Sequence, residues 1–136
     1  MNWTRVVGAG LGAGIVGWIA DFVMHGMMLG NTYKKYPQVF TQSEDPKAAV
    51  WFLLISVVTF LFAALLFSKT RQCWADGFKG GMTFGFFLGM VGFWTSFYSP
   101  LVIDGFPYFL AWCQGGATVI ASMLGGAVLG VVLKRG

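Results

Sequence analysis

Two side chains capable of acid–base chemistry stand one helical turn apart in the first apolar stretch of the chain. Asp21 is a carboxyl group surrounded by apolar residues, and His25, the only histidine, follows it at a spacing that places both on one helix face. Because a buried charge needs a partner, we expect a hydrogen bond between Asp21 and His25. Such a pair could bind a proton or a small cation.

Four long apolar stretches must position these residues, at approximately 5–30, 48–68, 77–99 and 106–133. Each is long enough to cross a hydrocarbon core of ~30 Å at ~1.5 Å per helical residue. Lipid offers no hydrogen-bond partners, so a spanning segment must form a helix. The 136 residues, 57% hydrophobic and 10% charged, are therefore predicted to form one all-α domain, 1–136: a polytopic membrane protein built as an antiparallel bundle of four transmembrane helices.

The basic residues predict the orientation of this bundle. Six flank one side and three the other: Arg5, Lys69, Arg71, Lys79, Lys134 and Arg135 against Lys34, Lys35 and Lys47. The positive-inside rule then places both termini in the cytoplasm and the acidic Glu44 and Asp45 outside. Ser43 followed by Pro46 predicts the start of the second helix. No run of five basic residues occurs, which argues against nucleic acid as a partner.

Further polar residues are expected near Asp21, which lies about 24 Å along the helix from Arg5 and so in the outer third of the bilayer. Ser96 on the third helix and Gln114 on the fourth fall at a similar depth. Together with His25 they predict a polar cluster that binds a ligand or an ion. The alternative is that these groups only hydrogen-bond the helices to one another.

A cofactor contact is a third interpretation of His25. Single helix histidines ligate haem or chlorophyll, and the flexible, polarizable side chains of Met24, Met27 and Met28 would contact such a molecule. No cofactor is required by the sequence, and no metal site is predicted. The two cysteines, Cys73 and Cys113, are expected at different depths of the membrane and so unable to form a disulfide with each other.

Glycines recur every four residues on three of the four helices, in a glycine-zipper pattern. The packing candidates are Gly10, Gly14, Gly77, Gly81, Gly85, Gly89, Gly126 and Gly130. A four-residue step forms a stripe on which another backbone can approach closely. We expect these stripes to pack helices within the chain, and part of this small surface to serve an oligomer or a larger assembly.

Enzymatic chemistry is not expected. The chain has no catalytic set of serine, cysteine and histidine, no HExxH sequence and no phosphate-binding loop after a strand, and it offers one candidate general base. No catalytic residue is therefore predicted.

Several residues resemble a group of uncharacterised bacterial four-helix integral membrane proteins. They are Met1, Asn2, Trp3, the glycines that follow, Asp21, Gly26, Leu29, and Trp51 after a polar loop. The resemblance covers most of the first helix and the general layout. It implies the bacterial inner membrane as the location and carries no established activity. The small multidrug exporters are also similar in having one carboxyl group on the first of four helices, but Asp21 lies nearer the outer surface and the charge bias is stronger.

Three functional hypotheses follow. The first is a non-enzymatic accessory subunit of a larger membrane complex, respiratory or photosynthetic. The second is a small homo-oligomeric transporter or channel with Asp21 as its proton or cation site. The third is a pigment or haem contact through His25. The partners expected are the lipid bilayer and either other membrane subunits or further copies of the chain.

Overall fold

The computed structural model describes residues 1–40 and 46–135, and these residues form a helical bundle. Ser43, Glu44 and Asp45, for which a helix start and an outer location were predicted, lie outside the described residues. The elements follow in the order α1 Trp3–Asp21, a π-helix Phe22–Met28, α2 Gly30–Lys34, α3 Pro46–Lys69, a 3₁₀ turn Arg71–Cys73, α4 Gly77–Thr95, a 3₁₀ turn Ser96–Tyr98, α5 Ser99–Val102 and α6 Tyr108–Val132.

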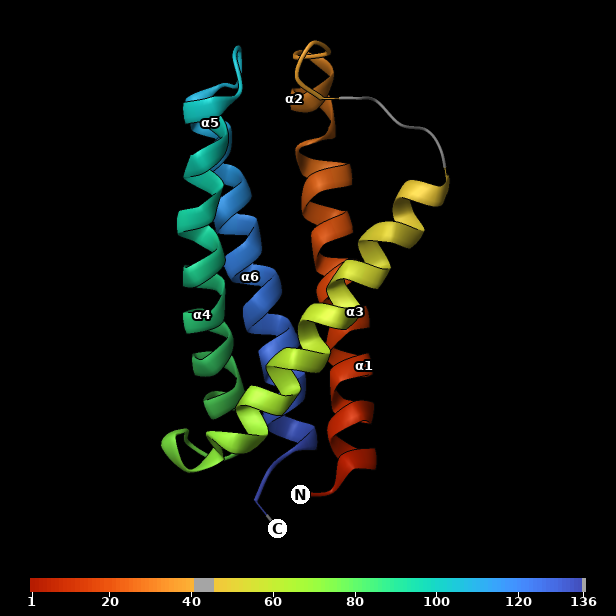
Figure 1. The fold of residues 1–136 in the computed structure, drawn as a ribbon, viewed down its shortest axis with the longest axis vertical. Coiled ribbons are helices and arrows are strands. Elements are labelled where there is room, and N and C mark those ends of the chain that lie inside the picture. Colours follow the sequence, from red (N-terminus) through yellow and green to blue (C-terminus); the bar gives the residue numbers. More distant parts are fainter. Residues whose placement is uncertain (41–45, 136) are drawn as a thin grey trace.

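Four helical segments are long and apolar enough to cross a membrane: Trp3–Met28, Pro46–Lys69, Gly77–Val102 and Tyr108–Val132. The predicted class, an all-α membrane protein with a four-helix bundle, is thereby confirmed. Both termini lie at one end of the bundle, which we call the basal end, and the turns after α2 and α5 lie at the opposite, distal end (Figure 1).

The first span differs from the uninterrupted helix predicted over 5–30. Its regular α-helix ends at Asp21, and the next seven residues form a π-helix closed by the Leu29 amide, which donates to the Met24 carbonyl oxygen at 3.0 Å. Gly30, the predicted helix end, instead begins α2. Apolar periodicity does not distinguish a π-turn from an α-turn, so this π-helix could not be predicted from the sequence.

The third span also extends beyond its predicted end at Ser99, because α5 carries the helical path on to Val102. The turn that follows contains Gly105 at φ 77°, a backbone conformation that side chains strongly disfavour. Pro107 is the N-cap of α6 and fixes the re-entry of the chain into the bundle.

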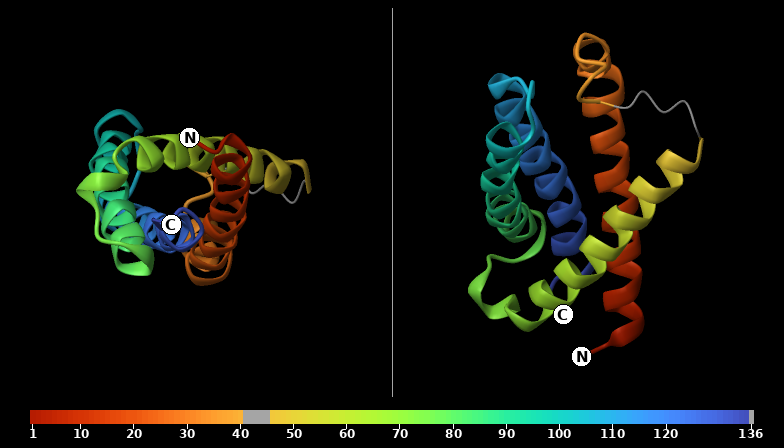
Figure 2. Two further views of the ribbon diagram at one scale, coloured as in Figure 1. Left: turned by 90° about the horizontal axis from the view of Figure 1, so that it is seen from below. Right: turned by 45° about the horizontal axis from the view of Figure 1, so that its top comes forward.

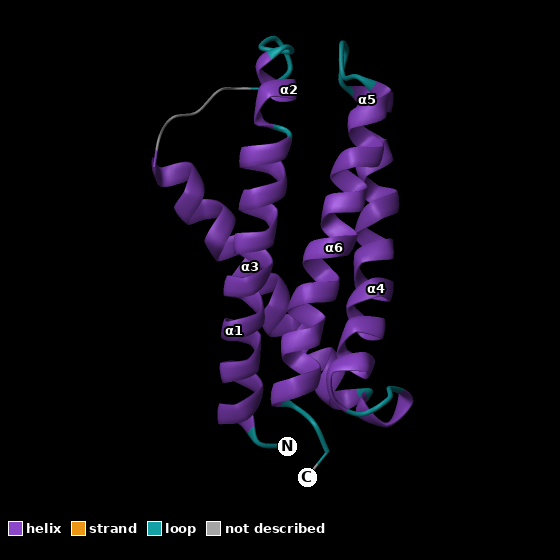
Figure 3. Ribbon diagram, turned by 180° about the vertical axis from the view of Figure 1, so that it is seen from behind, coloured by secondary structure: helices purple, strands orange, loops and turns teal. Residues whose placement is uncertain are grey.

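α4 packs against α6 through backbone contacts that only glycine permits (Figure 3). A Cβ atom placed on Gly81 would lie 2.7 Å from the Gly130 Cα, and one on Gly89 would lie 2.6 Å from the Val119 Cα. A Cβ on Gly126 would lie 2.8 Å from the Gly85 Cα. The two helices therefore run in direct backbone contact over several turns.

α1 packs against α3 in the same way where α3 crosses it obliquely (Figure 1). A Cβ on Gly14 would lie 2.7 Å from the Val57 Cα, and one on Gly10 would lie 2.9 Å from the Leu61 Cα. At this crossing the buried Ser56 hydroxyl donates to the Gly14 carbonyl oxygen at 2.8 Å. Ser56 therefore joins α3 to α1 through an interhelical hydrogen bond.

Gly77 differs from the other glycines of this contact. It has φ 69°, and a Cβ added to it would meet nothing within 4 Å. Its lack of a side chain is therefore needed for the turn into α4. Its backbone still packs against α6, because a Cβ on Gly130 would collide with the Gly77 carbonyl oxygen.

The hydrophobic core lies in the basal half of the bundle. It consists of Val6, Ala9, Ala13, Phe60, Ala63, Ala64, Phe67, Phe84, Leu129 and Leu133. The rings of Phe67 and Phe84 meet edge to face at 5.1 Å and join α3 to α4. By contrast, no residue from Trp18 to Phe40 and none from Pro46 to Ile55 is buried, and distal α3 leans away from the other helices (Figure 2). On the side of the first span and α3, the distal half is thus loosely packed, whereas Leu110 and Ala111 at the distal end of α6 are fully buried.

Candidate functional site

Three polar side chains meet in the distal half, between the first span and α6. The Tyr33 hydroxyl lies 2.6 Å from His25 Nδ1, and the Gln114 amide donates to the Tyr33 oxygen at 3.4 Å. The His25 and Tyr33 rings are nearly parallel, at an interplanar angle of 7°. With Asp21 one turn before His25, we call these four residues the distal polar cluster.

The local fold explains how Tyr33 reaches His25. The π-helix holds one residue more per hydrogen-bonded turn than an α-helix and is followed by the short α2, which carries Tyr33 back over His25. The Tyr33 ring also packs on Phe40 at 4.7 Å, and Phe40 packs on Phe106 at 5.5 Å. Aromatic contacts thus hold α2 against the turn before α6.

The proton positions in the cluster follow from its donors. Gln114 uses an N–H to bond the Tyr33 oxygen, so the tyrosine can give its own proton to His25 Nδ1. In that tautomer His25 carries its hydrogen on Nε2, which would have to lose this proton before it could ligate a haem or chlorophyll metal. In the other tautomer Nδ1 donates to the Tyr33 oxygen and Nε2 is free of a proton, so only the second tautomer fits a pigment contact at His25.

Asp21 stands apart from these bonds. Within residues 1–40 and 46–135 it makes no hydrogen bond and no ion pair, so the predicted bond from Asp21 to His25 is wrong, and His25 bonds Tyr33 instead. Burial raises the pKa of Tyr33 above its ordinary value, and the negative charge of Asp21 adds to this rise. Asp21 is therefore close enough to act on the cluster through its charge.

Ser96, the fourth predicted site residue, is not part of the cluster. Its hydroxyl donates to the Gly92 carbonyl oxygen of its own helix at 3.4 Å. Thr118 does the same on α6, donating to the Gln114 carbonyl oxygen at 3.0 Å. Such local bonds satisfy hydroxyl groups within a single helix, so these groups do not need a hydrogen-bond partner on a neighbouring helix.

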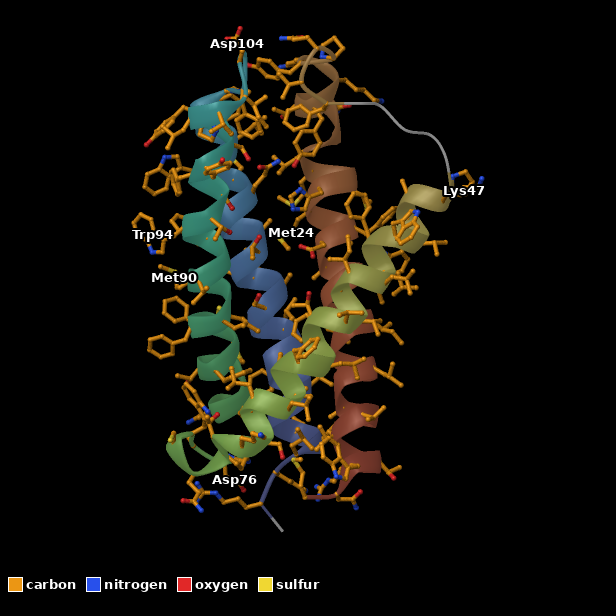
Figure 4. All side chains as sticks on the ribbon, viewed as in Figure 1. Met24, Lys47, Asp76, Met90, Trp94 and Asp104 are labelled. Atoms are coloured by element: carbon orange, nitrogen blue, oxygen red, sulfur yellow. The ribbon has the colours of Figure 1, made fainter. Side chains whose placement is uncertain are left out.

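Figure 4 shows Met24 between the first span and α6, with Asp104 at the distal end and Asp76 at the basal end. No group of three or more histidine, cysteine, aspartate or glutamate side chains that could hold a metal ion occurs in the described part of the chain. The chemistry that the distal cluster offers is therefore that of one carboxyl group, one imidazole, one phenol and one amide.

Fold and site together define the class: an all-α protein with four membrane-length helices and a polar cluster in its distal half. No protein-family model matches the chain, and neither a curated protein nor a solved structure matches it.

Proposed function

We propose that this chain is a small, non-enzymatic membrane transporter or channel in which Asp21 binds a proton or a small cation. The observation that carries the proposal is the state of Asp21: a carboxyl group within a membrane-length helix, without a hydrogen bond or ion pair to any described residue. An ionised group in hydrocarbon is costly by several kcal/mol, and such groups are generally retained where they bind a charge.

The surroundings of Asp21 would allow a bound proton or cation to be exchanged. The side chain is half-buried, no residue between Trp18 and Phe40 is fully buried, and the backbone next to it departs from α-helical geometry. His25 and Tyr33 provide a second pair of proton-carrying groups one turn toward the distal end. A proton or cation at Asp21 would thus have polar neighbours on the side facing the distal surface.

Flux measurements in proteoliposomes test this function. Purified wild-type chain is reconstituted with a pH-sensitive dye inside the vesicles, and pH, sodium, potassium and amine gradients are applied in turn. We expect one of these gradients to dissipate through the wild-type protein and the Asp21→Asn variant to reduce that flux to the level of empty vesicles.

Asp104→Asn is the matched control, since Asp104 is an exposed carboxyl group in the turn before α6. It should retain the wild-type flux. Equal flux in wild type and Asp21→Asn, or no flux for any of these gradients, would overturn the proposal.

The accessory-subunit hypothesis is the second candidate, and the distal half of α3 supports it. Val50, Trp51, Phe52, Leu54 and Ile55 are each 48–65% exposed, and they span more than half of the helix circumference. This part of α3 therefore receives little packing from its own chain, as expected for a segment that neighbouring subunits enclose in a respiratory or photosynthetic complex or in a homo-oligomer.

Gentle detergent extraction from the native membrane followed by native mass measurement tests that second candidate. A stoichiometric complex with other subunits is the expected result, and a monomer free of other proteins would exclude it. An absorption spectrum of the same sample also tests the third hypothesis, because a haem or chlorophyll band that disappears in His25→Ala would establish a pigment contact.

A further inference from the structure

A small pocket opens at the basal end of the bundle, far from the distal polar cluster. Its volume is about 140 Å³, more than four times the ~30 Å³ that a water molecule takes in the liquid. The lining consists of Asn2, Arg5, Val6, Ser68, Arg71 and Leu133. Two guanidinium groups, an amide and a hydroxyl thus converge on a space whose remaining walls are the buried, apolar Val6 and Leu133.

The two arginines hold the ends of the helices together around this pocket. Arg5 Nε donates to the Val132 carbonyl oxygen at 2.7 Å, and Arg71 Nε donates to the Leu133 carbonyl oxygen at 3.0 Å. Both bonds satisfy carbonyl groups at the C-terminus of α6. The pocket is therefore built by tertiary contacts between three chain segments, and its arginines are fixed in place.

Charge is unbalanced in the pocket. Arg71, whose side chain is 12% exposed, is paired with Asp76, and Asp76 also accepts a hydrogen bond from the Arg135 amide at 2.9 Å. The bond from Arg135 and the charge of Arg71 hold the pKa of Asp76 below its ordinary value, so it stays ionised and occupied by these partners. Asp76 is the only carboxyl side chain at the basal end within the described ranges, and it leaves Arg5 without a counter-charge.

The donors of the pocket match a phosphate group. Neither Nη group of Arg5 bonds a described residue, and the Ser68 hydroxyl likewise has no partner among residues 1–40 and 46–135. A guanidinium fork binds phosphate oxygens in a bidentate manner, and a hydroxyl can donate to a third oxygen. An anion in this space would meet at least three free donors and a net positive charge.

We propose that this basal pocket binds the headgroup phosphate of an anionic phospholipid. The pocket opens where α1, α3 and α6, three of the four membrane-length helices, end, which is the depth of the headgroups in a bilayer. Basic pockets between helix ends at this depth bind anionic lipid headgroups.

Lipid retention during release from nanodiscs tests the proposal. Wild-type protein is assembled with phosphatidylcholine and phosphatidylglycerol in equal amounts, released into detergent, and its bound lipids are identified by native mass spectrometry. We expect one phosphatidylglycerol to remain bound to the wild type. Arg5→Gln should weaken this retention by about tenfold, because a charge-assisted pair of hydrogen bonds is lost.

Ser68→Ala provides a second variant that leaves the helix-end bonds of both arginines intact. It should weaken retention by about threefold, as expected for one neutral hydrogen bond. Lys79→Gln is the matched control: it removes a positive charge from the same end of the bundle but lies on α4, outside the pocket lining. Retention in this control should equal that of the wild type.

Three results would overturn the proposal. The first is equal retention of phosphatidylglycerol in the wild type, Arg5→Gln and Ser68→Ala, and the second is equal retention of phosphatidylcholine by the wild type. The third is saturable binding of inorganic phosphate that Arg5→Gln removes, in a wild type that retains no phosphatidylglycerol, because the pocket would then serve a soluble anion. Circular dichroism on each variant verifies that the helices are intact before retention is compared.

Discussion

Tyr33 connects the first span to α6 at the level of single residues. Its hydroxyl is the shared partner of His25 and Gln114, and its ring is held between His25 and Phe40. Removing the hydroxyl leaves the ring contacts in place and breaks both hydrogen bonds. Tyr33 is therefore the residue through which the distal polar cluster can be tested without disturbing its packing.

We expect Tyr33→Phe to lower the free energy of unfolding by about 1 kcal/mol, since interhelical hydrogen bonds in membrane proteins contribute roughly 0.6–1.7 kcal/mol. Its effect should also depend on pH. The pKa of Tyr33 is raised above 10 in the folded protein, so the stability linked to it is complete below pH 10 and is lost as the pH rises through the folded pKa. Unfolding in mixed micelles, followed by circular dichroism at several pH values, measures both effects.

The wild type should therefore lose stability more steeply than Tyr33→Phe above pH 10, and the two curves should run parallel below it. Tyr36→Phe is a control, because Tyr36 makes none of the cluster's hydrogen bonds. Parallel curves over the whole range would show that Tyr33 is not held in its neutral form by the fold.

Residue type alone was sufficient to select three of the four cluster members. Asp21, His25 and Gln114 are unusual in apolar stretches, whereas Tyr33 follows them in a polar segment where a tyrosine suggests only a membrane interface. Ser96 was predicted in the cluster from its depth along the third helix. Depth does not show whether a hydroxyl group bonds the backbone of its own helix, as Ser96 does.

Among the helices, the pair α4 and α6 depends most directly on the absence of side chains. A Cβ on Gly85 would lie 2.8 Å from the Met123 Cα, a backbone atom that cannot move aside without shifting α6. We expect Gly85→Ala to lower the free energy of unfolding by about 1–3 kcal/mol, as overpacking does in other cores. Denaturant unfolding of the purified protein measures the change.

Gly116→Ala on α6 is the matched substitution in open space, because a Cβ there would meet nothing within 4 Å. It should leave stability unchanged or raise it by about 0.5–1 kcal/mol through the higher helix propensity of alanine. If both variants behaved alike, the contact between the α4 and α6 backbones would not determine their association.

The sequence predicted the existence of the four membrane-length spans better than the geometry within and between them. The second span, expected at 48–68, is Pro46–Lys69, and the fourth, expected at 106–133, is Tyr108–Val132. Helix length and hydropathy determine such spans, and both are properties of composition. The π-helix and the oblique path of α3 depend on which turns of neighbouring helices meet, and apolar periodicity does not contain that information.

The whole molecule is asymmetric between its two ends. The basal end holds the main buried core and the arginines that bind helix-end carbonyl groups, while the distal parts of the first span and α3 are loosely packed and the polar cluster lies beside them. A rigid basal half would anchor the helices in the bilayer. The distal half has room for the small rearrangements that loading and release of a proton or cation at Asp21 would require.

The difference in charge between the two ends makes the orientation in the membrane a specific prediction. From the six basic residues at the basal end, against three toward the distal end, we predict that both termini lie in the cytoplasm of a bacterial cell and that the distal cluster lies on the outer side of its inner membrane. Cys73 is exposed near the basal end, and Asp104 is exposed at the distal end. Cys73, and position 104 after the substitution Asp104→Cys, can each report their side of the membrane by reaction with a maleimide that does not cross lipid.

In spheroplasts, the Cys113→Ser variant should leave Cys73 unreactive toward this reagent until the membrane is permeabilised. A variant combining Cys73→Ser, Cys113→Ser and Asp104→Cys should instead react at once. The reverse pattern would place the distal cluster on the cytoplasmic side, and partial reaction of both positions in intact spheroplasts would indicate two opposite insertions. Two opposite insertions would bring the chain closer to the small multidrug exporters, since they would mean that the charge difference between the two ends does not determine a single orientation.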